Sequence, residues 1–283
     1  MPNALIDALD SADASGRLVW LDSLDFGARI VRNDKPFDWT DVTDFVSSFT
    51  KLQSLLKPDV VQLNVGQLLA AWLDANPGAL MEMRGKKRIR VALKKFLGME
   101  GPRDLAKELI GGLCASVSQP LVLVLPPNGD LINWANGMAN QVAPVDITDI
   151  DVDTVSVYLA DLIRTFNGMD VVGVMIQLPA RTSINQNLLE LYSPIINVAR
   201  HCHWAFGIEV SAPAEVSDPD SLVDFVISEE PVTANDVRSG LSLNGAFWNG
   251  TGSPEHIGFY HAAVPVDIAP EIILRRISEL KTV

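Results

Sequence analysis

Short, strongly apolar segments alternate with amphipathic ones along the chain. Five aliphatic residues, Leu121 to Leu125, end abruptly at the polar, turn-forming sequence PPNGD. The run VVGVMIQLP, which begins at Val171, is apolar almost throughout. A strand covered on both faces has this composition, whereas a half-exposed antiparallel strand alternates. The pattern predicts eight strands, at residues 18–21, 60–63, 121–125, 171–178, 205–210, 223–227, 241–248 and 259–265.

The segments between these strands have the period of amphipathic helices. In residues 41–57 the apolar positions lie on one face, and Asp41 is placed as the N-cap. Similar apolar stripes mark helices at residues 65–73, 105–113 and 155–166. Ser193 and Pro194 have the order of an N-cap and first helical residue, so the segment after Asn185 is either two helices or one kinked helix. The last helix is predicted to begin at Pro270 and ends in cationic residues.

This alternation predicts an α/β fold, a (β/α)8 or TIM barrel, formed as a single domain over residues 1–283. We allow for irregularity in its N-terminal third, because residues 28–31 compete with 18–21 for the first strand. The strand at 241–248 is also weakly marked. The alternative is a doubly wound open parallel sheet. Both folds place ligands at the carboxyl ends of the strands.

Composition narrows the range of functions. Hydrophobic residues make up 48% of the 283 residues, which excludes intrinsic disorder. The formal charge of −13 argues against nucleic-acid and anionic-membrane partners, because phosphates would be repelled. No apolar run approaches the ~20 residues of a spanning helix. The N-terminus lacks the basic region of a signal peptide, so we expect a cytoplasmic protein.

Three stretches resemble the superfamily of uroporphyrinogen decarboxylase and cobalamin-independent methionine synthase. They are QPLVLVLPPNGDLINWA, VYLADLIRTFNGMDVVGVMIQ and LYSPIINVARHCHWAFGIEV, within residues 103–211. The resemblance implies a TIM barrel and a decarboxylase-like (lyase) or methyltransferase-like reaction. The decarboxylase's arginine-rich motif has no counterpart, since LDFGARIVRND offers only Arg29 and Arg32. Cys114 and Cys202 precede strands, at the wrong end of the barrel for the methionine synthase zinc. No catalytic residue is carried over.

Two motifs contain residues that can bind metal ions, but neither has the arrangement that a metal site requires. In HCHW, His201 and His203 lie at the end of a helix, where positions two apart diverge. The acidic sequence DITDIDVD resembles a calcium loop, but reading from Asp149 the sixth position is Thr154 and the twelfth is Ala160. Its aspartates instead suit the start of a helix. We predict no metal and no cofactor.

Two further segments have a structural and a functional interpretation. Residues 85–96 hold six basic side chains, which suit a solvated helix face, or else an anion site or lid. The turn after the predicted strand 241–248 contains glycines that would let a ligand approach the backbone. An ordinary glycine turn is favoured there; its proposed ligand-binding residues are Asn249, Gly250, Thr251 and Gly252.

Polar residues at the strand ends are the remaining candidates. Carboxylates from neighbouring strands, together with an imidazole, can perform acid–base chemistry. The proposed catalytic residues are Glu209, Glu229 and His261. The proposed substrate-binding residues are Asn128, Asp130, Gln177 and Arg181.

The sequence therefore predicts a barrel enzyme that acts on a small anionic metabolite by acid–base chemistry, of decarboxylase-like or group-transfer type. The alternative is a non-catalytic barrel that binds a ligand and has lost the family's chemistry. A homodimer is left open.

Overall fold

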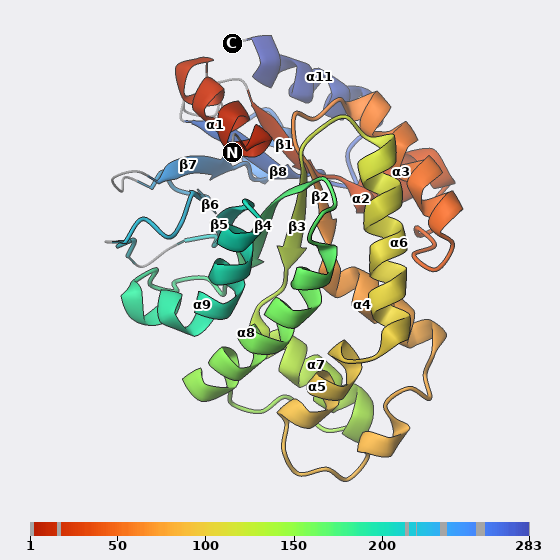
Figure 1. Ribbon diagram of the computed structural model, residues 1–283. Helices are drawn as coiled ribbons and strands as arrows, with labels where there is room; N and C mark the ends of the chain where they lie inside the picture. Colours follow the sequence, from red (N-terminus) through yellow and green to blue (C-terminus); the bar gives the residue numbers. More distant parts are fainter. Residues whose placement is uncertain are drawn as a thin grey trace.

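The computed structural model describes residues 3–15, 18–212, 215–218, 220–232, 237–252 and 258–282, and these form a TIM barrel (Figure 1). Its eight strands pair in the order β1-β8-β7-β6-β5-β4-β3-β2, and every pairing is parallel. Consecutive strands are therefore neighbours around a ring. The prediction of a barrel is confirmed, and the open-sheet alternative is wrong. The strands are β1 (Val19–Asp22), β2 (Val61–Asn64), β3 (Leu121–Leu125), β4 (Val171–Gln177), β5 (Ala205–Glu209), β6 (Phe225–Ser228), β7 (Arg238–Ser242) and β8 (Phe259–Ala263).

The ring closes between β1 and β2 through a narrow seam. A single bridge joins Trp20 to Val60. Beside it, the backbone N–H of Val19 donates to the Asp59 carboxylate at 2.8 Å, and the Asp59 N–H donates to the Val19 carbonyl at 2.8 Å. The irregularity expected in the N-terminal third is this seam.

Helices cover the first half of the barrel more densely than the second. Helices lie in every connection from β1 to β5, whereas the described residues between β5 and β6, and between β6 and β7, contain none. Figure 1 shows α5 and α7 beyond the C-terminal end of β3. The α-helices are α1 (Ala4–Ser15), α2 (Leu24–Arg32), α3 (Val42–Leu56), α4 (Val65–Ala75), α5 (Arg90–Leu97), α6 (Glu100–Ser116), α7 (Asn128–Asn140), α8 (Asp149–Ile163), α9 (Gln186–His201), α10 (Gly245–Trp248) and α11 (Pro270–Thr282), with 3-10 turns at Met81–Met83 and Arg164–Phe166.

Some predicted boundaries are wrong. Residues 241–248 are the end of β7 followed by α10, because the Asn244 side chain accepts from the Ala246 N–H and caps a helix there. Residues 28–31 belong to α2 and do not compete for the first strand. Pro194 lies inside α9, which is one helix. The last helix begins at Pro270, as predicted.

The barrel lumen has its own apolar core. Trp20, Phe225 and Phe259 pack against one another within it, with ring centroids 5.5 to 6.3 Å apart. A Cβ at Gly207 would lie 2.0 Å from the Phe225 ring, so glycine is what admits this ring. Leu5 and Leu9 of α1 are fully buried in the same cluster. Helix α1 therefore closes one end of the lumen, and its contacts leave the strand C-termini open to a site.

No helix among the described residues is long and apolar enough to cross a membrane.

Candidate functional site

Four polar side chains share the lumen side at or near the C-terminal ends of their strands. Side chains alternate along a strand, so residues two apart point the same way. Asp22, Gln177 and His261 each lie two positions after a residue of the lumen core, namely Trp20, Met175 and Phe259. Glu209 is in register with Gln177 on β4 and with the lumen residue Ile227 on β6.

Glu209 stands at the centre of this group. Its Oε2 accepts a hydrogen bond from Gln177 Nε2 at 2.9 Å. Its Oε1 lies 3.8 Å from His261 Nδ1, too far for a hydrogen bond. The Glu209 side chain is 23% exposed, whereas that of His261 is 3% exposed. Gln177 therefore orients the Glu209 carboxylate, which is reached by solvent and lies near the buried imidazole.

His261 is buried with neither ring nitrogen hydrogen-bonded to a described residue. The Trp20 indole packs edge-on against its ring, with centroids 5.8 Å apart. That indole is itself fixed, because Nε1 donates to Gln62 Oε1 at 2.7 Å. Buried polar groups in proteins nearly always have partners, so an imidazole that lacks one is a candidate for contact with a ligand.

Asp22 completes the group, and the sequence analysis did not select it. Burial raises the pKa of Asp22, and the negative charges of Glu209 and Asp25 raise it further. The positive form of His261 opposes that shift. The available signal was its position: Asp22 follows the apolar VWL of the first strand, as the selected rim residues follow theirs.

The electrostatics of this group suit proton transfer. A carboxyl group with a raised pKa retains its proton at a higher pH than usual, while a neighbouring carboxylate can accept one. Within the described residues, no three His, Cys, Asp or Glu side chains are grouped so that they could hold a metal ion. The geometry therefore offers a proton donor, a proton acceptor and an unpaired imidazole in one place.

The candidate residues that follow β3 and β6 lie outside the lumen group. Asn128 is buried and its Nδ2 donates to the Val152 carbonyl at 2.9 Å and to Ser156 Oγ at 2.8 Å, so it fastens α7 to α8. Asp130 lines a cavity of about 290 Å³ between α4 and α7. Glu229 is exposed just after β6.

The proposed anion-binding residues also lie away from the lumen group. Arg181 is exposed, with φ 64°, in the loop after β4. The turn formed by Asn249, Gly250, Thr251 and Gly252 packs against α11, where a side chain at Gly250 would collide with the Arg276 guanidinium. Residues 253–257, which complete that segment, lie outside the described residues.

The acidic motif before α8 caps the helix, as predicted. Asp149 and Asp151 lie in the first turn of α8, and Thr148 and Asp151 form a reciprocal capping box. Hydrogen bonds from Thr148 hold the pKa of Asp151 below its ordinary value.

The two histidines of the HCHW motif lie at the end of α9. His201 is the last residue of α9, and His203 has φ 59° in the turn after it.

The basic segment is divided: residues 85–89 form the connection before α5, and Arg90, Lys94 and Lys95 lie on α5 itself. Arg90 Nε lies 3.1 Å from Asp151 Oδ1, Lys95 Nζ lies 2.9 Å from Glu82 Oε1, and Lys94 lies over the Tyr158 ring. Leu93 and Phe96 are its buried side. These partners agree with the interpretation as a helix face.

Comparison with known proteins finds no matching family and no matching curated protein. Two similar solved structures come from Rhizobium etli. One is a pyruvate carboxylase variant crystallised without acetyl coenzyme A, with TM-score 0.41 and 9% identity over 99% of this chain and 30% of that chain. The other is a variant carboxyl transferase domain of pyruvate carboxylase with pyruvate, with TM-score 0.40 and 10% identity over 99% and 51% of the two chains. This chain thus spans about 30% of the length of the first chain and about half of the second. TM-scores and identities this low carry no functional argument.

Proposed function

We propose that this protein is an enzyme that transfers protons to and from a small polar molecule at the C-terminal end of the barrel. The observation that carries the proposal is the convergence of Asp22, Glu209 and His261, with the imidazole buried and lacking a hydrogen-bond partner among the described residues. Acidic, basic and imidazole side chains at the strand ends of a barrel can perform general acid–base catalysis.

The roles follow from the environment of each group. Glu209, oriented by Gln177 and reached by solvent, accepts a proton from the substrate. Asp22, whose pKa is raised by burial, donates a proton to another substrate atom. His261 hydrogen-bonds the substrate between them. One proton leaves the substrate and one arrives, so the charge on the substrate is unchanged. Glu209 then releases its proton to solvent and Asp22 takes one up from solvent, which returns the enzyme to its starting state.

Of the two reaction classes that the sequence suggested, group transfer suits this site better. In a group transfer, Glu209 would deprotonate the attacking atom and Asp22 would protonate the leaving atom. A decarboxylation starts from an anionic carboxylate, which the negative charge of Glu209 would repel. We therefore keep the small metabolite and the acid–base chemistry but not the negative charge.

Comparing the protein with Glu209→Gln in deuterium oxide tests the proposal. Each is incubated with a mixture of small metabolites, and mass spectrometry follows loss of compounds and uptake of deuterium. We expect at least one compound to be consumed or labelled by the unmodified protein and not by Glu209→Gln, because the amide cannot accept the proton.

Glu229→Gln is the matched control, since Glu229 is exposed outside the lumen group. It should retain turnover. Equal activity of Glu209→Gln and the unmodified protein would refute the assignment. If neither consumed nor labelled any compound, the protein would be the non-catalytic ligand-binding barrel instead.

A further inference from the structure

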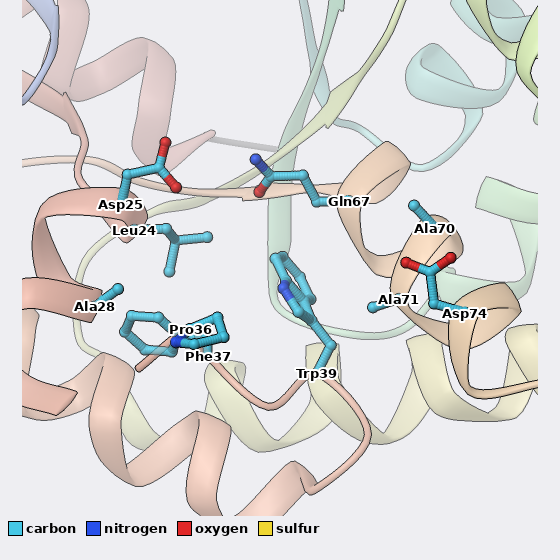
Figure 2. Close-up of a pocket in the computed structure, with 10 residues that line it drawn as sticks. All are labelled: Leu24, Asp25, Ala28, Pro36, Phe37, Trp39, Gln67, Ala70, Ala71 and Asp74. Atoms are coloured by element: carbon cyan, nitrogen blue, oxygen red, sulfur yellow. The ribbon is translucent and has the colours of Figure 1, made fainter. Parts of the chain in front are cut away.

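Two cavities adjoin on the exposed face of α4, beside the lumen site. The first, between α2 and α4, has a volume of about 350 Å³ and is shown in Figure 2. The second, of about 290 Å³, lies between α4 and α7. Gln67 and Ala70 line both. We call the two together the α4 trough.

The α4 trough combines carboxylates with indole rings. Asp25, Asp74 and Asp130 line it, together with Trp39 and Trp134, and none of the described residues that line it is Lys, Arg or His. In Figure 2 the Asp25 carboxylate and the Gln67 amide point toward each other across the opening, and the Trp39 ring stands between the helices. The lining therefore favours positive charge and apolar surface in the same ligand.

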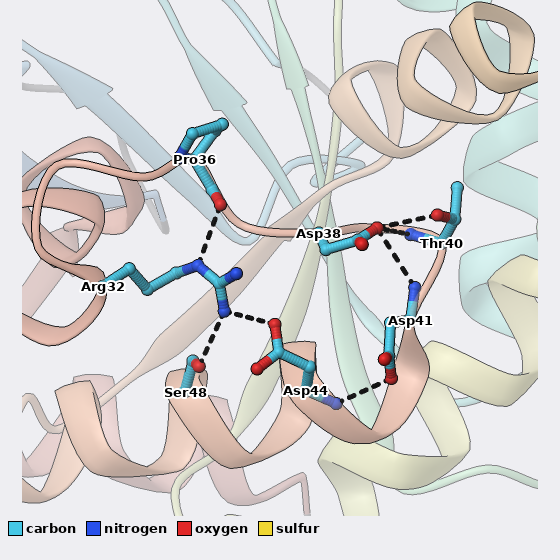
Figure 3. Close-up of polar contacts among 7 residues, drawn as sticks. All are labelled: Arg32, Pro36, Asp38, Thr40, Asp41, Asp44 and Ser48. Carbon is cyan, nitrogen blue, oxygen red and sulfur yellow. Dashed lines mark hydrogen bonds and ion pairs between the residues drawn. The ribbon is translucent and has the colours of Figure 1, made fainter.

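Arg32 holds the loop that carries Trp39, and its guanidinium lies over the Phe37 ring, 5.5 Å from the centroid. Arg32 forms an ion pair with Asp44 and donates to Ser48 Oγ at 3.0 Å and to the Pro36 carbonyl at 2.8 Å (Figure 3). Asp38 in the same loop accepts from Thr40 Oγ1 at 2.7 Å. These bonds order the aromatic wall of the trough before any ligand arrives.

We propose that the α4 trough binds an aliphatic amine with two or more ammonium groups. Ammonium groups would pair with Asp25 and Asp74, and the methylene chain would lie over Trp39 and Phe37. Gln67, which faces Asp25 across the opening in Figure 2, is seven residues before Asp74 on α4, a helical rise on the order of 10 Å. A ligand that reaches both carboxylates must therefore be an extended chain, as a triamine is. The inference goes beyond the proposed function, because binding in the trough requires no turnover.

Calorimetric titration with spermidine tests the proposal. We expect one molecule to bind per chain, and Asp25→Asn and Asp74→Asn each to weaken binding by about threefold or more, as loss of an accessible ion pair predicts. Trp39→Ala should weaken it further, and Trp39→Phe should restore much of the loss, because an aromatic face remains. The dicarboxylate glutarate should not bind.

Asp170→Asn is the control for overall charge, since Asp170 is exposed and precedes β4 at the other end of the barrel. It removes the same charge and should leave spermidine affinity unchanged within about twofold. Equal weakening by Asp170→Asn and Asp25→Asn would show non-specific attraction to an acidic protein and overturn the site, as would absence of binding. Glu209→Gln should still bind spermidine, so loss of catalysis and loss of this site are distinguishable.

Discussion

At the scale of single residues, environment gives chemically identical side chains opposite properties. Burial raises the pKa of Asp22 in the lumen, whereas hydrogen bonds from Thr40 lower the pKa of Asp38 in the exposed α2–α3 loop. Both positions are aspartates beside apolar residues in the sequence. The shift at Asp38 comes from a local partner, Thr40, two residues later. The shift at Asp22 comes from its surroundings in the fold, chiefly burial in the barrel, and also from Glu209 on another strand.

The two aspartates should affect stability with opposite dependence on pH. A raised folded-state pKa contributes stability at low pH that is lost as pH rises through that pKa. Asp22→Asn removes this contribution, so the variant should gain stability relative to the unmodified protein as pH rises above the ordinary aspartate value. Urea unfolding at pH 4, 5, 6 and 7 measures this difference.

For Asp38 the sign reverses. Its lowered pKa contributes stability above the ordinary aspartate value that is lost as pH falls through the folded-state pKa. Asp38→Asn should therefore lose stability relative to the unmodified protein as pH rises from 3 toward 4. Because Asp38 is exposed, solvent screening keeps this change small.

For Asp22, identical pH profiles of Asp22→Asn and the unmodified protein would contradict the argument that burial raises its pKa.

At the scale of elements, the spacing of apolar residues predicts a helix, but it does not show against which surface that helix packs. Leu5, Leu9 and Ala12 have the spacing of one helical face, and in the structure all three are buried in the lumen core. The side chain of Asn3 anchors this helix, donating to the carbonyls of Val172 and His203 at 2.8 Å. Helix α1 is thus a plug in the barrel and not a member of its outer layer.

Leu9→Ala should destabilise the protein by about 2–5 kcal/mol, because a fully buried side chain leaves a cavity that a closed barrel cannot fill. The matched control is Leu55→Ala in α3, where the leucine is 45% exposed and the expected change is within about 0.5 kcal/mol. Urea unfolding measures both. Equal losses would show that α1 does not pack as a plug.

At the scale of the whole molecule, the barrel depends on a seam that few contacts close. Asp59 joins β1 to the segment before β2 through Val19, and it also lies 3.3 Å from Lys281 Nζ in the last helix. Lys281 donates in turn to the Lys57 carbonyl at 2.6 Å. The last helix therefore contacts the segment before β2 at the seam, and strand order alone does not account for closure.

Asp59→Ala should lower the free energy of unfolding by about 1–3 kcal/mol, because the Val19 N–H loses its acceptor at the seam. Asp59→Asn keeps an oxygen acceptor and should cost less. Lys281→Ala removes the ion pair together with the hydrogen bond to the Lys57 carbonyl, for which about 1–2 kcal/mol is expected. Chemical denaturation that ranked Asp59→Asn below Asp59→Ala in stability would contradict this account.

The sequence by itself determined the alternation of buried strands with helices, which favoured the barrel over an open sheet, and the strand-end positions of Gln177 and Glu209. These features follow from the local spacing of apolar residues, which can be recognised without knowing the tertiary contacts. Only the tertiary structure decided which strand-end residues meet. Register and closure place Asp22 of β1 near Glu209 of β5, while Asn128, equally well placed in sequence, turns toward α8. Such encounters depend on strand pairing and helix docking between distant segments, and a one-dimensional pattern does not carry that information.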